Sequence, residues 1–302
     1  MTVTLPRLGI GTAAFGGLFT PVAEADALDA VRVAAELGVR YFDTAPRYGH
    51  GLAERRLARG LRESGPSDAV VSTKVGWLLR DGQTVVPDWT ERGIRASLES
   101  SLERLGRDHV DIAFIHDPDD AADEVRRTAY PALRRLRDEG VVRAIGFGMN
   151  HADPLAAFVG EFDVDVVLVA GRFTLLDHRA LTTLLPACAA TATQVVVGGV
   201  FNTGLLAEPS AAAKYDYRPV GPDMLERALR CQEICAGYDV ALAAAAVQFP
   251  LLHPAVTTVL VGCRSGAEVA ANAAAAGREI PADLWAELAA AGYVPAELLT
   301  AV

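Results

Sequence analysis

The sequence predicts an α/β fold, a closed (β/α)8 TIM barrel that forms one domain over residues 1–302. Short aliphatic runs alternate with segments of helical length, and runs such as VDVVLVA and TQVVVGGV are nearly continuous in Val and Leu. A strand has this composition when helices cover both faces of a parallel sheet. The length fits as well, because such barrels have about 250 residues and accept small additions at their ends. A doubly wound open sheet also alternates strands and helices and is the alternative.

Eight aliphatic runs are the expected barrel strands. They lie at residues 8–12, 40–45, 70–75, 110–116, 142–147, 165–170, 194–200 and 257–261. Helices are expected between them, where apolar residues recur every three or four positions or where Ala dominates. These segments lie at residues 28–35, 94–105, 133–136 and 267–276. Gly38 and Gly140 would end the first and the third, and Asp88 or Thr90 would cap the start of the second.

Composition and charge narrow the classes of function. The chain is 51% hydrophobic and 22% charged, and its 28 Lys and Arg against 38 Asp and Glu give a net charge of −10. This acidic balance argues against non-specific binding to nucleic acid or to an anionic membrane, and it leaves room only for a local basic pocket.

The start of the chain lacks the basic and apolar regions of a secretory signal, so a reduced, cytoplasmic protein is expected. The uncharged stretch 240–263 contains Gln248 and Pro250 at its middle, which favours a buried helix, a turn and a buried strand over a membrane span. The four cysteines have no metal-binding spacing and are expected to pack in the core. They are Cys188, Cys231, Cys235 and Cys263.

The segment Gly9-Ile-Gly11-Thr-Ala-Ala14 matches a dinucleotide-binding fingerprint, yet its surroundings argue against that interpretation. The motif requires a strand before it and a helix that opens within it. Only eight residues precede it here, and FGGLFTP follows in place of a helix.

Four polar residues stand at or near the ends of three successive predicted strands. Asp43, Lys74 and His116 end these strands, and Tyr48 follows Asp43 by five positions. Each alone has an ordinary structural explanation, such as a turn cap or a solvated side chain. Because the carboxyl ends of barrel strands meet at one mouth, we expect the four to converge there.

These residue types suit proton transfer at an oxygen atom. A nearby ammonium lowers the pKa of a phenol, so Lys74, held by Asp43, is expected to lower the pKa of Tyr48. Tyr48 would then act as general acid or base, and His116 would orient a carbonyl or alcohol oxygen. The cluster has no nucleophile and no metal, so a cofactor is expected to carry the other half of the reaction, most simply a hydride.

At these residues the sequence resembles the aldo-keto reductase superfamily over almost its whole length. The resemblance lies in YFDTAPRYGHGLAERRLARGL, VVSTKVG, SLERLGRDHVDIAFIHDPDD and LRRLRDEGVVRAIGFGMN. It implies a barrel that binds a nicotinamide cofactor across its mouth, with Asp43, Tyr48, Lys74 and His116 as the catalytic tetrad. The segments AGRFTLLD, GGVFNTGLL and KYDYRP are similar to the sugar dehydrogenases of the D-threo-aldose 1-dehydrogenase, L-fucose dehydrogenase and L-galactose dehydrogenase branch, with pyridoxal 4-dehydrogenase nearby. An aldose such as L-fucose, L-galactose or D-arabinose would be oxidised at C1.

The resemblance also implies a set of cofactor-binding residues for NAD or NADP. The candidates are Gly11, Thr12, Asp43, Asn150, Gly199, Phe201, Gly204, Leu205, Gly262, Arg264, Ser265, Glu268 and Asn272. The start of the helix near Ser265 also suits a phosphate on physical grounds. Family members that prefer NADP often carry Lys and Arg where this chain has Gly262 and Glu268, which favours NAD. The usual Gln after the sixth strand and the usual stacking aromatic near Gly198 are absent from the sequence.

Phe15, Trp77, Asp117 and the loop 214–218 are candidates for the substrate rim, and a small sugar or carbonyl compound is the expected partner. The oligomeric state cannot be read from the sequence. Three other functions remain open: a general aldehyde or ketone reductase or pyridoxal dehydrogenase, a redox-sensing barrel subunit without turnover, and a metal-dependent hydrolase built on His116, Asp117 and Asp119.

Overall fold

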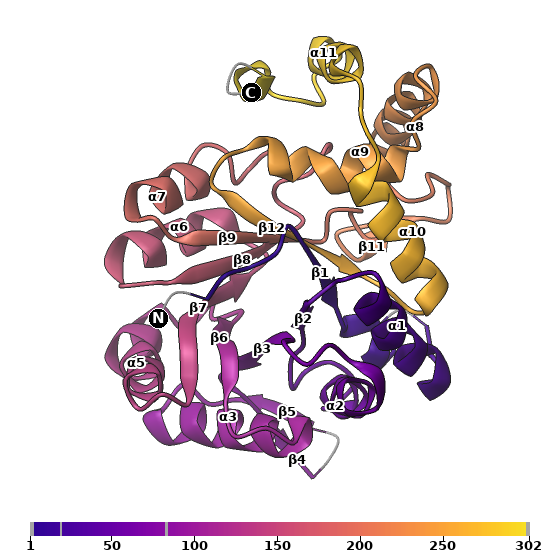
Figure 1. Ribbon diagram of the computed structural model, residues 1–302. Coiled ribbons are helices and arrows are strands. Elements are labelled where there is room, and N and C mark those ends of the chain that lie inside the picture. Colours follow the sequence, from indigo (N-terminus) through magenta and orange to yellow (C-terminus); the bar gives the residue numbers. More distant parts are fainter. Residues whose placement is uncertain (1–2, 19, 82–83, 300–302) are drawn as a thin grey trace.

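Eight parallel strands close into a barrel in the computed structural model, which describes residues 3–18, 20–81 and 84–299 (Figure 1). Their order around the barrel is β1-β12-β9-β8-β7-β6-β3-β2, and β1 pairs with both β2 and β12. The TIM barrel prediction is therefore confirmed and the open sheet is excluded. The strands are β1 Leu8–Gly11, β2 Tyr41–Asp43, β3 Val70–Val75, β6 Val110–His116, β7 Val142–Met149, β8 Val166–Ala170, β9 Gln194–Gly198 and β12 Val256–Gly262. Each coincides with a predicted run to within two residues at either end.

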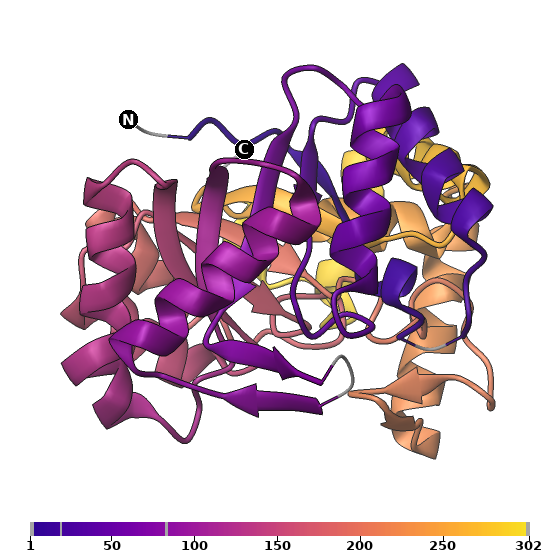
Figure 2. The ribbon, with the colours of Figure 1, turned by 90° about the horizontal axis from the view of Figure 1, so that it is seen from below.

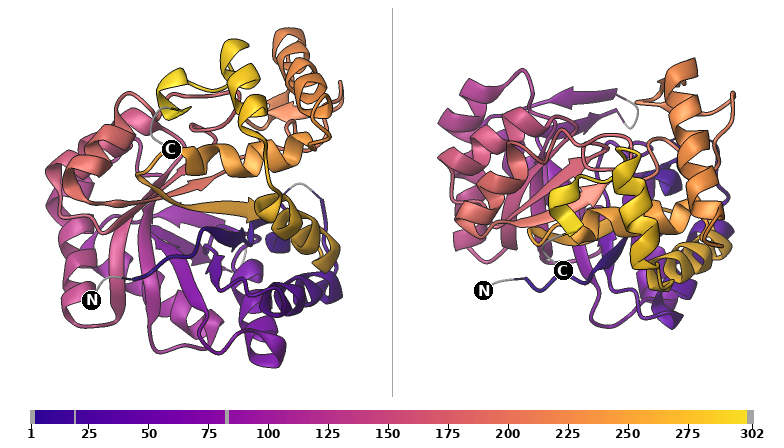
Figure 3. Two further views of the ribbon diagram at one scale, coloured as in Figure 1. Left: turned by 45° about the horizontal axis from the view of Figure 1, so that its top comes forward. Right: turned by 90° about the horizontal axis from the view of Figure 1, so that it is seen from above.

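Helices form the outer layer around the barrel (Figure 3). They are α1 Glu24–Glu36, α2 Leu52–Ser64, α3 Glu91–Leu105, α4 Ala122–Glu124, α5 Tyr130–Asp138, α6 Ala152–Glu161, α7 Leu184–Thr191, α8 Pro222–Ala236, α9 Leu242–Gln248, α10 Gly266–Gly277 and α11 Ala282–Ala290. Thr90 caps α3 by accepting a hydrogen bond from the backbone of Gly93, while Asp88 accepts one from the Thr90 hydroxyl. Gly38 and Gly140 have the positive φ expected of residues that follow a helix.

Two short hairpins that the sequence analysis did not predict lie at one end of the barrel. The first is β4 Trp77–Arg80 with β5 Thr84–Pro87, and the second is β10 Lys214–Tyr215 with β11 Arg218–Pro219. Figure 2 shows both at the end opposite the N-terminus, which is the carboxyl end of the barrel strands. The loop expected at residues 214–218 is therefore a tight hairpin.

The barrel has separate inner and outer cores. Tyr41, Ile112, Phe114, Val166 and Leu260 belong to the inner cluster. The larger outer cluster lies between strands and helices and includes the buried thiols of Cys188, Cys231, Cys235 and Cys263. This division explains the aliphatic runs, because alternate residues of each strand face two different apolar layers.

The structure also resolves the two ambiguous segments of the sequence. β1 is followed by a short 3-10 helix, Ala13–Gly16, so the Gly9–Ala14 match lacks the helix that a dinucleotide fingerprint requires. Residues 240–263 form α9, the 3-10 turn Phe249–Leu252 and β12. Within the described ranges, no helix is both long and apolar enough to cross a membrane.

The turn after the Ala13–Gly16 helix touches the loop after β2. A Cβ atom on Gly16 would lie 2.5 Å from the Tyr48 carbonyl carbon and 2.6 Å from the Gly49 nitrogen. Gly49 has φ +59°, and a Cβ atom there would collide with the backbone of Gly16. Glycine at both positions thus allows the backbone contact that fixes the loop around Tyr48.

We expect Gly49→Ala to lower the free energy of unfolding by about 1–3 kcal/mol, because it adds both backbone strain and overlap with rigid backbone. Chemical denaturation of the two proteins would measure the difference. Gly160→Ala in α6 is the matched control: nothing lies within 4 Å of its new Cβ, so it should be neutral or stabilising by about 0.5–1 kcal/mol. Equal effects of the two substitutions would contradict the role assigned to the Gly16–Gly49 contact.

Candidate active site

The four residues singled out in the sequence lie together at the carboxyl end of three adjacent strands. Asp43 ends β2, Lys74 is the last residue but one of β3, and His116 ends β6. These strands are neighbours in the barrel, so their ends bring the three side chains to one side of its mouth. Tyr48, from the loop after β2, completes the group.

Lys74 and Asp43 form a buried ion pair at the base of this group. Lys74 Nζ donates to Asp43 Oδ2 at 2.6 Å and to the Thr44 carbonyl at 2.9 Å, and both side chains are 2% exposed. The Ser72 hydroxyl donates to Asp43 Oδ1 at 2.7 Å. Because each charge has polar partners, the pair can be tolerated in the interior and its geometry is closely defined.

The ammonium of Lys74 lies against the ring of Tyr48. Its Nζ is 4.7 Å from the ring centroid. Burial would lower the pKa of Lys74, but the negative charge of Asp43 and the contact with Tyr48 outweigh it and raise the pKa. Lys74 is therefore an ammonium ion over the whole physiological range.

The expected net lowering of the pKa of Tyr48 is wrong. Burial raises the pKa of Tyr48, and this exceeds the opposite effect of Lys74. The sequence could not give this result, because it shows the cation but not how much water the fold removes from the phenol. Tyr48 thus carries its proton.

His116 is held as a neutral imidazole. Burial and the positive charges of Lys74 and Arg47 place the pKa of His116 well below 6.5. Its ring meets that of Tyr48 edge to face, with centroids 6.1 Å apart, and its carbonyl accepts a 2.7 Å hydrogen bond from the Trp77 indole. Nδ1 is buried and has no hydrogen-bond partner among the described residues.

Arg47 forms a wall beside His116 together with two of the expected rim residues, and the sequence analysis missed it. Its guanidinium lies 4.2 Å from the Trp77 ring centroid and donates to Asp117 Oδ2 at 3.1 Å. Phe15, in contrast, is fully buried in the outer core, so its expected place on the rim is wrong. Its backbone carbonyl instead accepts from Arg56 and supports the turn beside Gly49.

Small residues line the mouth opposite Lys74. Gly148, Ala170 and Gly198 belong to β7, β8 and β9, and β9 is four strands away from β3 in the ring of eight. A Cβ atom on Gly148 would make ordinary contacts with Phe114 and Lys74, and one on Gly198 would do so with Leu168 and Ala170. Their side-chain positions therefore point inward, toward residues such as Phe114 and Leu168 of the inner core.

Asn202 provides an unused amide next to these small residues. It is 3% exposed, and neither atom of its side-chain amide has a partner within the part of the chain that the structure describes. Its Nδ2 lies 3.9 Å from the Cβ position of Gly171. A buried amide without a partner is costly, so its presence indicates a ligand that supplies the missing hydrogen bonds. The sequence signal was Asn within GGVFNTGLL, a segment in which Gly199, Phe201, Gly204 and Leu205 were the candidates.

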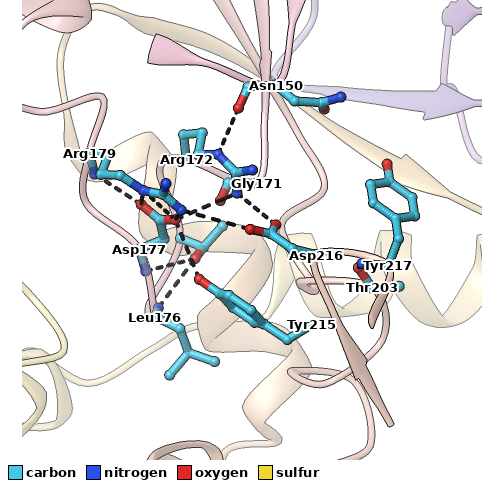
Figure 4. Close-up of polar contacts among 11 residues, drawn as sticks. Asn150, Gly171, Arg172, Leu176, Asp177, Arg179, Thr203, Tyr215, Asp216 and Tyr217 are labelled. Atoms are coloured by element: carbon cyan, nitrogen blue, oxygen red, sulfur yellow. Dashed lines mark hydrogen bonds and ion pairs between the residues drawn. The ribbon is translucent and has the colours of Figure 1, made fainter. Parts of the chain in front are cut away.

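Arg172 connects this side of the mouth to the β10–β11 hairpin (Figure 4). Its guanidinium donates to the carbonyls of Asn150 and Gly171 and to Asp216 at 2.7 Å. Figure 4 shows the Tyr215 hydroxyl directed toward Asp177 and the Tyr217 hydroxyl directed away from this cluster. Arg172 thus stands where the family's usual Gln was missing and fixes the backbone around it.

The other candidate cofactor residues lie in three places around the same mouth. Gly11 and Thr12 follow β1, and the buried Thr12 hydroxyl has no partner among the residues described. Gly199 and Gly204 have positive φ after β9, Phe201 is half-buried, and Leu205 is fully buried, so only the backbone of Leu205 can reach a ligand.

The remaining candidates surround the start of α10. Ser265 caps this helix, Gly262 has open space at its Cβ position, and Asn272 donates to Cys263 Sγ at 3.3 Å. Arg264 is bound by Glu268, whose carboxylate accepts from its guanidinium at 2.5 and 2.7 Å and from its backbone at 2.8 Å. Arg264 is the only basic residue among the candidate cofactor residues, and its charge is therefore already neutralised.

The residues of the metal-hydrolase alternative have other partners. Asp117 pairs with Arg47, and Asp119 Oδ1 lies 2.6 Å from His151 Nδ1. Across residues 3–18, 20–81 and 84–299, no three His, Cys, Asp or Glu side chains are grouped as a metal site would require.

Comparisons with known proteins identify the family of the chain. A model of the aldo/keto reductase family matches residues 7–292. D-threo-aldose 1-dehydrogenase of Pseudomonas sp is 44% identical over 97% of this chain and 96% of its own length. Pyridoxal 4-dehydrogenase of Microbacterium luteolum is 35% identical (97% and 95%), and L-galactose dehydrogenase of Arabidopsis thaliana is 33% identical (89% and 83%). The resemblance stated from the sequence is confirmed.

Solved structures are similar over nearly the whole chain. An aldo-keto reductase from Bacillus halodurans, in its holo form, has a TM-score of 0.78 and 26% identity over 94% of this chain and 91% of its own. The glycerol dehydrogenase from Gluconobacter oxydans has a TM-score of 0.81 at 23% identity, over 96% and 92%, which shows the shared fold alone.

The low pKa of His116 predicts a pH dependence of stability. The folded protein binds this proton less readily than the unfolded chain, whose histidine has the ordinary value of 6.5. The free energy of unfolding should therefore fall as the pH drops below about 6.5, until the folded pKa is passed. Denaturation of the wild type and of His116→Asn at several pH values isolates this contribution, since the other histidines are common to both. Parallel curves would contradict a neutral, buried His116.

Proposed function

The chain belongs to the aldo/keto reductase family and is an NAD(P)-dependent oxidoreductase, and we propose that it oxidises an aldose at C1, with Tyr48 as the general base. The observation that carries this proposal is the buried Lys74–Asp43 pair beneath Tyr48, with a neutral His116 beside it. The 44% identity to D-threo-aldose 1-dehydrogenase supports the substrate class. L-fucose, L-galactose and D-arabinose are the first candidates.

In the proposed reaction, the anomeric hydroxyl loses its proton to the Tyr48 phenolate while C1 loses a hydride, so that the hemiacetal becomes a lactone. NAD⁺ or NADP⁺, when bound, accepts that hydride and brings a positive ring charge to the mouth. His116, being neutral, donates one hydrogen bond to the reacting oxygen without a competing charge. Reduction of a carbonyl uses the same groups in reverse, with the Tyr48 hydroxyl as the acid.

Lys74 and Asp43 act on Tyr48 rather than on the substrate. The ammonium at 4.7 Å stabilises the phenolate and offsets part of the burial that raises the pKa of Tyr48. Asp43, fixed by Ser72, prevents Lys74 from moving away or losing its proton. This arrangement keeps the cation in place while the phenol alternates between its two forms.

The nicotinamide end of the cofactor would be held by the side of the mouth that carries Gly148, Ala170 and Gly198, where the unpartnered Asn202 amide would supply hydrogen bonds. Its adenosine end would lie at the start of α10. The Glu268 carboxylate that binds Arg264 would repel a 2′-phosphate, so NAD is favoured over NADP.

A single set of assays tests this function. The purified protein would be mixed with NAD⁺ or NADP⁺ and each aldose or pyridoxal, and with the reduced cofactors and simple aldehydes, while the absorbance of reduced nicotinamide is followed. Reduction of NAD⁺ by one group of aldoses is the expected result. Turnover of pyridoxal alone, or of aldehydes with reduced cofactor alone, would replace the aldose substrate. Binding of cofactor without turnover of any compound would support the redox-sensing alternative.

Tyr48→Phe should reduce kcat by about 100- to 10,000-fold, because it removes the group that exchanges the proton and leaves the ring in place. The dissociation constant of NADH, measured by fluorescence, should stay within about twofold of the wild type. Tyr238→Phe, at a half-buried tyrosine that follows α8 and bonds Glu287, is the matched control and should retain full activity. Turnover by Tyr48→Phe at the wild-type rate would refute the mechanism.

Asn202→Gly should weaken NADH binding by about tenfold, because the amide is proposed to bond the nicotinamide end. Glycine tolerates the φ of +46° at this position, so the backbone is preserved. ADP-ribose lacks nicotinamide, and its affinity should be unchanged. Asp239→Gly, at another left-handed position after α8, is the control. If the affinities for NADH and ADP-ribose fell equally, Asn202 would bind a part of the cofactor other than the nicotinamide.

A further inference from the structure

Arg47, Trp77 and Asp117 form a compact unit, here called the polar wall, that borders His116. They come from three separate places: the loop after β2, the first residue of β4, and the residue after β6. The Arg47 guanidinium lies on the Trp77 ring and donates to Asp117, and the Trp77 indole donates to the His116 carbonyl. Each member is thus fixed by another member or by the catalytic strand end.

The Asp117 carboxylate of the polar wall lies beside the His116 ring, which is proposed to bind the reacting oxygen of the substrate. Asp117 Oδ2 is 3.6 Å from His116 Nε2. A substrate whose reacting oxygen accepts a hydrogen bond from His116 therefore brings a hydroxyl on its neighbouring carbon within hydrogen-bond reach of Asp117. Arg47 Nη1 contacts the same carboxylate oxygen, so a donor and an acceptor lie side by side.

The two charged groups are accessible and their charges cancel. The Arg47 side chain is 38% exposed and that of Asp117 is 24% exposed. A neighbouring donor and acceptor match a vicinal diol, in which each hydroxyl both donates and accepts. Because the pair has no net charge, it favours an uncharged polyhydroxy compound over a carboxylate or phosphate.

The backbone at Asp117 holds its carboxylate beside His116. Its φ is +46°, and its backbone N–H donates to the Gly148 carbonyl at 3.0 Å, which holds the turn against β7. Burial also raises the pKa of Asp117, and only part of this is offset by Arg47.

We propose that Arg47 and Asp117 bind the hydroxyl groups next to the reacting carbon and thereby select polyhydroxylated substrates. Trp77 positions Arg47, whose guanidinium covers one face of the indole ring. This inference rests on the proposed function, since it assigns the part of the substrate that lies beside the reacting centre.

The test compares two aldehydes that differ only in hydroxyl groups, glyceraldehyde and propanal, each reduced with NADH. Asp117→Asn and Arg47→Gln should lower kcat/KM for glyceraldehyde by about 10- to 100-fold and leave propanal within about threefold. Asn accepts the left-handed backbone, so Asp117→Asn should preserve the turn. The dissociation constant of NADH should be unchanged in both variants.

Arg143→Gln provides the matched control. Arg143 makes a 2.9 Å ion pair with Asp111 near the start of β6, at the opposite end of the barrel. It should leave both substrates unaffected. Equal losses on glyceraldehyde and propanal in the polar-wall variants would show an effect on His116 or on the fold and would overturn the proposal, as would the absence of any loss.

A failure of the proposed function can be distinguished from a failure of the polar-wall proposal. If the wild type reduces neither aldehyde and oxidises no aldose, the function is wrong. Calorimetric titration of the NAD⁺-loaded protein with L-fucose then decides the role of the polar wall. Binding to the wild type that weakens tenfold or more in Asp117→Asn supports it, whereas equal or undetectable binding overturns it.

Discussion

The buried ion pair between Lys74 and Asp43 is the constraint on which the mouth of the barrel depends. Removing one partner of such a pair costs about 3–5 kcal/mol, so the surrounding structure must supply every remaining hydrogen bond. Ser72 and the Thr44 carbonyl do so, and Tyr41 reaches Ser72 at 2.9 Å from inside the barrel. The register places Asp43 opposite Ser72 on β3, two residues before Lys74. The inner packing and the active site are therefore one continuous structure.

One cation acts on two neighbouring groups with different results. The charge of Lys74 opposes the burial of Tyr48 but acts together with the burial of His116. Tyr48 keeps its proton and His116 stays neutral, although both rings are within 6.1 Å of each other. Separate pKa values for adjacent groups are what acid–base chemistry at neutral pH requires. Here the separation arises mainly from burial and the Lys74 ammonium, with Asp43 adding to the rise for Tyr48 and Arg47 adding to the fall for His116.

The sequence predicted the features that depend on strand position. Eight aliphatic runs define the barrel, and residues at the ends of consecutive strands must meet at its mouth, so Asp43, Lys74 and His116 could be placed together. Features that depend on loop conformation were missed or misplaced. No sequence pattern near Arg47 indicates its place in the site, because its partners Trp77 and Asp117 are 30 and 70 residues away in sequence. The burial of Phe15, the orphaned amide of Asn202 and the net pKa shift of Tyr48 all depend on packing, which composition and spacing do not contain.

Two Arg–Asp pairs from loops lie on different sides of the catalytic group. Arg47–Asp117 stands beside His116, and Arg172–Asp216 joins the end of β8 to the β10–β11 hairpin (Figure 4). Each links segments that are distant in sequence, and each is neutral as a pair, although the chain as a whole has a charge of −10. In the proposed reaction, the strand ends would provide a proton-transfer site that is independent of the substrate's remaining groups. Selectivity must then come from the loops, and a mouth framed by neutral, strongly hydrogen-bonding pairs offers many polar contacts to an uncharged sugar and little attraction to an ion.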